Sequence, residues 1–179
     1  ELKTPQYYKT YTGANVSKYL EGNLTEDHVR VISGNVLTGE NIGKNGFVGF
    51  YDHLVSVIPE GDKYELFGWI LPTVNKLSFH RAFGLLSFLA PKKEFSIGTN
   101  VYGEKRAFVQ TGIFEQVTPL DILPTFLLKA IMAEDYDEME ALGIYEVIEE
   151  DLALCEFVDV SKHEIQSILR EGLNLIKNS

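Results

Sequence analysis

Cysteine is almost absent from this chain of 179 residues, in which Cys155 is the single example. One thiol excludes an intrachain disulfide, and a chain without disulfides is typical of a reducing, intracellular setting. One thiol also excludes a four-iron cluster held within the chain, because such a cluster normally needs four thiolates. Free cysteines usually behave as small apolar side chains, so we expect Cys155 to be buried.

Basic residues are scarce relative to acidic ones. The chain has 16 Lys and Arg against 26 Asp and Glu, which gives a net charge of −10 and an isoelectric point near 4.8. Such a charge repels phosphate backbones and anionic lipid heads, so we expect no nucleic-acid partner and no direct lipid binding. A hydrophobic content of 45% is enough for the core of one ordinary domain or two small ones.

Long apolar runs are also missing. A helix that spans a membrane needs about 20 predominantly apolar residues. Lys129 interrupts the run after Pro124, and Gly84 and Ser87 break the run at 82–90. We therefore expect no membrane insertion, so that any action at a membrane would require a partner. The chain begins at Glu1 with no targeting segment, which indicates a piece of a longer protein.

The common catalytic and cofactor motifs are absent. The sequence contains no HExxH pair, phosphate-binding P-loop, G-x-G-x-x-G fingerprint or nucleophile elbow. Turn formation explains the repeated glycines of the loop at 43–49. The four histidines are scattered without a cysteine companion, which argues against a zinc site; they are His28, His53, His80 and His163. We assign no catalytic, cofactor-binding or metal-binding residue.

The first 72 residues show the sequence pattern of a small β-rich module. Residues 7–22 alternate like a strand and then turn at Gly13 into a short helix, with Asn15 as N-cap and Gly22 just past its end. Residues 28–40 show period-two strands with glycine turns, and residues 53–72 predict a hairpin that turns at 59–62. Strand, short helix and further strands predict a β-grasp-like module at 1–72.

Residues 73–118 predict a connecting helix and hairpin. Residues 78–89 are apolar around most of a helical circumference, and residues 93–109 predict a hairpin that turns at Gly103. Aromatic residues gather near this helix, at Trp69, Phe79, Phe83 and Phe88. Core packing is the favoured interpretation of these rings, with a pocket for a quinone head group as the alternative.

Residues 119–179 predict a helical region. Asp121 is the expected N-cap of its first helix, because this start places Pro124 in the opening turn. A second helix is expected at 134–142, ended by Gly143. Ser161 and Glu164 form an S-x-x-E capping box for the last helix. Its apolar stripe has 3-4 spacing and consists of Ile165, Ile168, Leu169, Leu173 and Ile176.

This region also carries most of the carboxylates. They lie at Glu134, Asp135, Asp137, Glu138, Glu140, Glu146, Glu149, Glu150 and Asp151. Their spacing lacks the pattern of an EF-hand loop, and sequence alone cannot give the fixed separation that paired catalytic carboxylates need. A solvated helix face is the favoured interpretation, followed by an acidic surface that meets a partner.

Three segments carry a resemblance to a known family. They are PLDILPTFLLKAI at 119–131, ALG at 141–143 and EEDLALC at 149–155. They resemble the C-terminal region of the NqrA family, the NqrA subunits of the sodium-translocating NADH:quinone oxidoreductases. VISG at 31–34 and VLTG at 36–39 match less specifically. The resembling sequences carry a second Cys-Pro four residues after the equivalent of Cys155, where this chain has Asp159 and Val160.

The resemblance implies an α+β fold, in which a soluble-ligand-binding β-grasp (SLBB-type) module precedes the connection and the C-terminal helical region. It implies a part in NADH oxidation by quinone coupled to sodium export, on the cytoplasmic side of the bacterial inner membrane. NADH, flavins and the iron–sulfur centre would belong to other subunits. This chain would contribute to assembly, through docking on a membrane-embedded subunit, and to quinone access.

Two alternatives remain open at this point. The β-grasp module would itself bind a small molecule such as quinone, and a pocket with convergent polar groups would favour that role. The second alternative is an electron-transfer domain, related to those of the Rnf complexes and complex I, that has lost its cluster.

Overall fold

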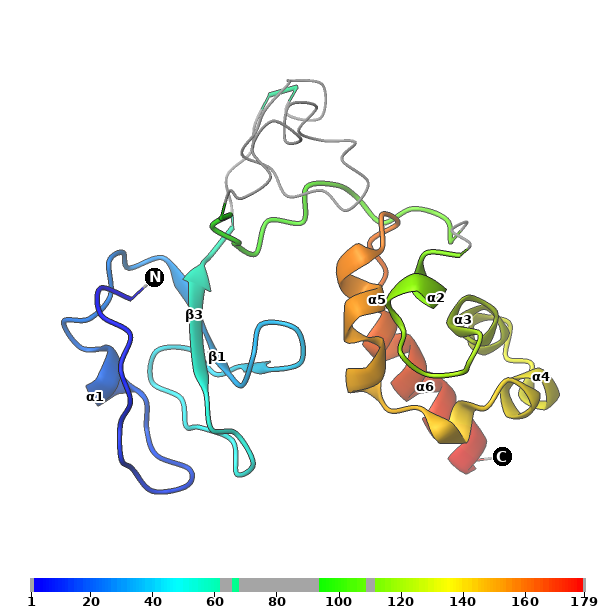
Figure 1. Ribbon diagram of the computed structural model, residues 1–179, viewed down its shortest axis with the longest axis horizontal. Helices are drawn as coiled ribbons and strands as arrows, with labels where there is room; N and C mark the ends of the chain where they lie inside the picture. Colours follow the sequence, from blue (N-terminus) through cyan, green and yellow to red (C-terminus); the bar gives the residue numbers. More distant parts are fainter. Residues whose placement is uncertain (1, 62–65, 68–93, 109–111, 179) are drawn as a thin grey trace. The chain divides into compact units, whose positions relative to one another are not determined.

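The computed structural model describes residues 2–61, 66–67, 94–108 and 112–178. The chain divides into two compact units, Glu1–Tyr102 and Gly103–Ser179. Figure 1 shows strands in the first unit and helices in the second. The observed fold is therefore α+β, as the sequence predicts. No described helix is long and apolar enough to cross a membrane.

A three-stranded antiparallel sheet forms the centre of unit 1 (Figure 1). Its strands are β1 (Val29–Ser33), β2 (Glu40–Asn41) and β3 (Val55–Pro59), in the order β2-β1-β3. Val31 lies opposite Val57 and Ser33 opposite Glu40. The strands predicted at 28–40 are confirmed, and Val31 of β1 is buried against the helix described next.

The short helix α1 (Ser17–Leu20) packs on this sheet. Val16 is its N-cap residue, but Asn15 still supports the start, because its side-chain oxygen accepts the Ser17 N–H at 3.0 Å. Gly22 adopts a φ of 72° just past the end, as predicted. The core of unit 1 consists of Val16, Leu20 and Val31, and partly buried residues surround it.

The strand predicted before α1 is wrong. Residues 7–11 are exposed and pair with no described strand, so their alternating pattern has no ladder to join. The predicted hairpin at 53–72 is seen as far as β3, which includes Pro59, whereas Asp62 and most of the second arm lie outside the described residues. The helix predicted at 78–89, with Trp69, Phe79, Phe83 and Phe88, also lies outside them.

The hairpin predicted at 93–109 is wrong over the part that the structure describes. Residues 94–108 form no strand. Their backbone bonds go elsewhere: Thr99 N–H donates to Pro59 O, and Arg106 N–H donates to Ser161 O. Tyr102, with a φ of 49°, takes the left-handed conformation that the sequence suggested for Gly103.

Unit 2 is built from helices around one core (Figure 1). They are α2 (Phe114–Val117), α3 (Pro124–Met132), α4 (Tyr136–Ala141), η2 (Ile144–Glu146), η3 (Glu149–Leu152), α5 (Ala153–Val158) and α6 (Ile165–Asn178). The fully buried side chains at the centre include Phe114, Leu127, Leu128, Met139 and Leu169. The predicted stripe of α6 faces this core: Ile165 and Leu169 are buried, and its other members pack against them.

Helix α3 begins at Pro124, so this proline lies in the opening turn of the helix, as expected. Asp121 is not its N-cap; Leu123 occupies that position and supplies no side-chain hydrogen bond. The Thr125 N–H instead donates to Oε1 of Glu115, at 3.2 Å. A carboxylate from α2 therefore accepts a backbone N–H at the start of α3, as the side chain of an N-cap residue would. Sequence periodicity does not reveal this contact.

Helix α4 matches the prediction closely. Asp135 is its N-cap and accepts the Glu138 N–H at 3.2 Å. Gly143 follows the helix with a φ of 83°, a left-handed conformation in which glycine avoids the cost that a Cβ would add.

The capping box predicted for α6 is wrong. The helix begins at Ile165, so Ser161 lies too early to cap it, and the Ser161 hydroxyl donates to Ala107 O at 3.2 Å. Glu156, from the preceding helix α5, accepts the Gln166 N–H at 3.0 Å. The chain bends sharply before α6, with Lys162 at a φ of 59°, and this bend displaces Ser161 from the helix start.

Candidate interaction surface

Cys155 is fully buried in the core of unit 2. Its sulfur lies 3.2 Å from the hydroxyl oxygen of Thr118 and 3.9 Å from the Phe114 carbonyl oxygen. Burial raises the pKa of the Cys155 thiol above its ordinary value, although the hydrogen bond with Thr118 opposes that shift. A neutral buried thiol is a packing element, which confirms the expectation for this residue.

Asp159, four residues after Cys155, holds the bend before α6. Its carboxylate accepts the Ser161 N–H at 2.9 Å and the His163 N–H at 2.8 Å, and one oxygen lies 3.2 Å from Nδ1 of His163. Both side chains are almost completely buried, and the His163 ring meets Phe108 edge-on. These contacts give Asp159 a structural role in the loop.

Among the described residues, the other histidines do not form a site with His163. His28 and His53 lie on exposed parts of unit 1, and His80 is outside the described residues. Across the described ranges, no three His, Cys, Asp or Glu side chains gather as metal ligands would.

The carboxylates singled out in the sequence lie mainly at the surface of α4, η2 and η3. Several support local structure: Asp135 caps α4, Asp151 accepts the Ile148 N–H, and Glu149 pairs with Arg170. Glu140 accepts a hydrogen bond from the Tyr145 hydroxyl, and this bond raises the pKa of Tyr145. These carboxylates therefore lie at the surface, as a solvated face and an acidic partner surface both require.

The charge of the chain is divided unevenly between the units. Residues 1–102 contain ten basic and ten acidic residues, whereas residues 103–179 contain six basic and sixteen acidic residues. Unit 2 therefore carries the entire net charge of −10. No Lys or Arg occurs from 130 to 161, the segment that builds α4, η2, η3 and α5.

Large apolar side chains are exposed on the same unit. On α5 and just beyond it they are Leu154, Phe157 and Val160, with exposed fractions of 43%, 46% and 45%. On α3 and just before it, Leu123 and Phe126 are exposed by 51% and 54%. Apolar side chains that share one helix face form a patch, and patches of this kind mark interaction surfaces more often than isolated residues do.

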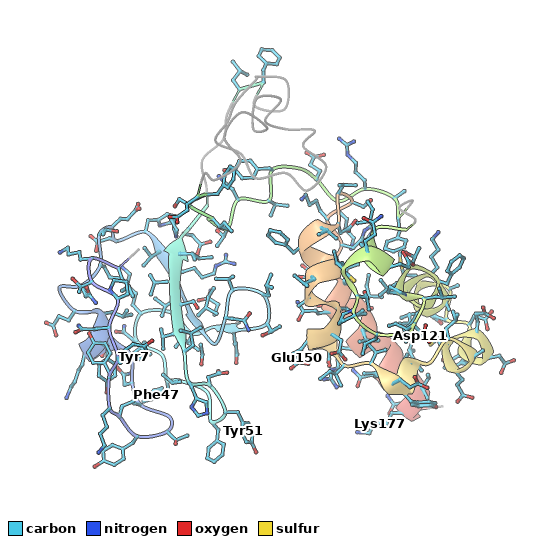
Figure 2. All side chains as sticks on the ribbon, viewed as in Figure 1. Tyr7, Phe47, Tyr51, Asp121, Glu150 and Lys177 are labelled. Carbon is cyan, nitrogen blue, oxygen red and sulfur yellow. The ribbon has the colours of Figure 1, made fainter. Side chains whose placement is uncertain are left out.

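Unit 1 presents aromatic side chains on a fixed loop. Ser33 donates to the Asp52 carboxylate at 2.5 Å and accepts the Gly49 N–H at 2.8 Å, which ties the loop to the end of β1. Phe50 and Tyr51, between these anchors, are exposed and meet edge to face. Figure 2 shows the Tyr51 side chain directed outward from this unit. The loop was not recognised as a site in the sequence, where only its glycines gave a signal.

A hollow of about 410 Å³ lies on unit 1. Its walls are largely apolar and come from Leu2, Pro5, Val36, Val57, Ile58, Pro59, Phe95, Ser96 and Ile97. Ser96 is the single polar side chain among them. Small-molecule sites usually direct several polar groups at the ligand to fix its orientation, and this hollow does not.

The sequence comparisons agree with the resemblance seen in the motifs. The family described as the NQRA C-terminal domain matches residues 1–44. The chain is 43% identical over 178 residues to the NqrA subunit of the Na(+)-translocating NADH-quinone reductase of Shewanella frigidimarina, covering 99% of this chain and 40% of that protein. The corresponding subunit of Serratia proteamaculans is 42% identical over 178 residues, with 99% of this chain and 39% of that protein covered.

The corresponding subunit of Haemophilus influenzae is 44% identical over 179 residues, again with 99% of this chain and 39% of the relative covered. The chain thus spans about two fifths of the length of the curated relatives it matches. Along almost its whole length, the chain is therefore similar to the NqrA subunits of Na(+)-translocating NADH-quinone reductases.

Proposed function

We propose that this chain is the part of an NqrA subunit that helps to hold that subunit in a sodium-translocating NADH:quinone reductase complex, and that it contributes no redox chemistry of its own. Support comes first from the relatives named as that subunit, which match 99% of the chain. Through this role the chain takes part in NADH oxidation by quinone coupled to sodium export. NADH, flavins, the iron–sulfur centre and quinone reduction belong to the complex.

The distribution of charge and apolar surface is the observation that carries the docking role. Unit 2 combines the entire net negative charge with exposed apolar side chains on two helices, and its buried thiol is used for packing. A surface with apolar anchors and a charged rim is typical of protein–protein interfaces. The partners we propose are the other subunits of the reductase, above all a membrane-embedded one, on the cytoplasmic side of the membrane.

The finer description of the fold is part of this proposal. The antiparallel sheet β2-β1-β3, with α1 packed on it, supports a β-grasp module of the soluble-ligand-binding type. We propose the division into this module at 1–72, a connection at 73–118 and a C-terminal helical region at 119–179. The apolar hollow of unit 1 gives a ligand-binding role no specific support.

Deletion of residues 119–179 from the intact tagged subunit tests the docking role. We expect the truncated subunit to be lost from the complex during co-purification, and quinone reductase activity to fall with it. NADH oxidation by artificial acceptors should persist, because NADH binds to another subunit. Full retention of the truncated subunit, with normal sodium-coupled activity, would overturn the proposal.

Element and flavin analysis of the purified chain tests the absence of redox chemistry. We expect no stoichiometric iron, flavin or zinc, and no absorption above the aromatic band. One equivalent of iron or flavin would favour the electron-transfer alternative instead.

A further inference from the structure

Helix α5 is apolar on two faces, although it has only six residues. One face is packed into the core of unit 2 through Cys155 and Val158, with Leu152 just before the helix. The other face carries Leu154 and Phe157, which lie three residues apart and therefore on the same side. A helix that packs on a core with one side needs only one apolar face. Core packing therefore does not account for the second apolar face of α5.

Two further large apolar side chains are exposed close to the two ends of this segment. Val160 follows Phe157 by three residues, and Ile148 lies just before η3 with an exposed fraction of 56%. We call the set Ile148, Leu154, Phe157 and Val160 the α5 stripe. Its four members are large and apolar and are each exposed by two fifths or more.

The surroundings of the α5 stripe are acidic. Glu149, Glu150 and Asp151 form the turn that leads into α5, and Glu150 is exposed. In Figure 2, Glu150 is labelled beside the end of α5 that follows η3. The segment 130–161, which contains the stripe, holds eleven acidic residues and no basic one. By contrast, the exposed residues of α3 are followed by Lys129.

We propose that the α5 stripe is a docking site for a basic amphipathic segment of a partner protein, a proposal that rests on the docking role proposed above. Apolar side chains of that segment would cover Leu154 and Phe157. Its Lys and Arg side chains would lie against Glu150 and Asp151, where opposite charge speeds association and selects the partner.

The charge of the surface favours a basic protein segment over nucleic acid, anionic lipid or a second copy of the chain. Nucleic acid and anionic lipid carry the same sign as the 130–161 segment and are repelled by it. A second copy would place two such segments face to face in a symmetric contact, so the same repulsion opposes self-association. A basic protein segment is the occupant that satisfies both the apolar and the acidic parts of the surface.

Substitution of Phe157 in the intact subunit tests this site. The full-length tagged protein with Phe157→Ser would be co-expressed with the other reductase subunits, and its retention in the complex measured by quantitative pull-down. We expect a loss of about tenfold in binding, as for one central interface residue. The matched control is Phe47→Ser, which removes the same ring from an exposed position of unit 1 and should leave retention unchanged. Phe126→Ser, on the exposed face of α3, asks which of the two helices of unit 2 carries the contact.

A charge reversal tests the acidic part. Glu150→Lys, at an exposed carboxylate, should weaken retention at low salt and flatten its dependence on salt concentration. Thermal unfolding of each variant checks that the fold is kept, which we expect for exposed side chains. Val160→Ser offers a second test of the stripe if Phe157→Ser lowers the unfolding temperature.

The outcomes separate this inference from the docking role. Loss of retention with Phe126→Ser and not with Phe157→Ser would overturn the α5 stripe while leaving unit 2 as the docking unit. Normal retention after deletion of 119–179 would overturn the docking role as well. A change in the monomer–dimer balance with Phe157→Ser, seen by light scattering without effect on the complex, would assign the stripe to a second copy and overturn the proposal.

Discussion

The Asp159 carboxylate accepts the backbone N–H of His163 at 2.8 Å and lies 3.2 Å from ring Nδ1 of the same residue. Because Asp159 also accepts the Ser161 N–H, one buried side chain fixes the turn between α5 and α6. In this chain the position supports the fold through hydrogen bonds.

Replacement of Asp159 by Ala should therefore be strongly destabilising. It would leave two buried N–H groups without an acceptor, and each such group costs about 1–3 kcal/mol. We expect the free energy of unfolding to fall by about 2–4 kcal/mol in urea denaturation. Asp121→Ala, at an exposed carboxylate that caps no helix, is the control and should change stability by less than about 0.5 kcal/mol. Equal effects of the two substitutions would contradict the role of Asp159.

The start of α6 should depend on Glu156 and not on a capping box. Glu156→Ala removes the acceptor of the Gln166 N–H and should cost about 1 kcal/mol, the usual effect of losing a cap. Glu164→Ala, the other half of the predicted box, should cost less than about 0.5 kcal/mol. Chemical denaturation of the two variants distinguishes a start of α6 capped by Glu156 from one capped by the predicted box. A larger loss of stability with Glu164→Ala would support the capping box.

Acid should weaken the contact between Arg30 and Glu60. Hydrogen bonds from Arg30 and then Thr99 lower the pKa of Glu60 below the ordinary value of 4.5. The contribution to stability is therefore complete above the pKa of the unfolded chain and is lost as pH falls through the lower, folded value. Glu60→Gln should cost about 0.5–1 kcal/mol at pH 7, since the pair is partly exposed.

Urea denaturation over a pH series measures this effect. The difference in unfolding free energy between the parent chain and Glu60→Gln should shrink as pH falls below about 4.5, the ordinary value for a Glu. Glu40→Gln, on the exposed strand β2, serves as the matched substitution for the loss of one carboxylate. A difference that stays constant from pH 7 to pH 3 would rule out this role for the pair.

Gly172 allows α3 and α6 to pack closely. A Cβ at this position would lie 2.8 Å from Cγ1 of the buried Ile131, so Gly172→Ala should destabilise unit 2 by about 1–3 kcal/mol despite the better helix propensity of Ala. The same substitution in an Ile131→Ala background should cost less, because the clashing atoms are gone. Additive effects in this double-mutant cycle would show that the two residues do not meet.

Cys155 should react slowly with thiol reagents in the folded chain. It is fully buried, and burial raises the pKa of its thiol, so little thiolate is exposed to the reagent. We expect the reaction with a disulfide reagent to be complete only after unfolding in urea. Rapid stoichiometric reaction under native conditions would contradict the packing described here.

Local sequence patterns were enough to predict the elements whose signals lie within a few residues. Gly22 and Gly143 end helices because their left-handed conformations suit glycine, and Pro124 lies in the opening turn of α3. The apolar stripe of α6 was equally readable, since it depends only on helical periodicity. The motifs at 119–131 and 149–155 also carried the family resemblance.

The tertiary structure alone decided the contacts between residues distant in sequence. Glu115 from α2 caps α3, and Glu156 from α5 caps α6, so that Asp121 and Ser161 lose the roles that local patterns gave them. The α5 stripe likewise depends on the tertiary structure, because the packing of the core buries the opposite face of α5 and leaves this one exposed. Spacing along a sequence specifies which residues share a face. Which face is buried, and which distant carboxylate reaches a free N–H group, depends on how the helices pack.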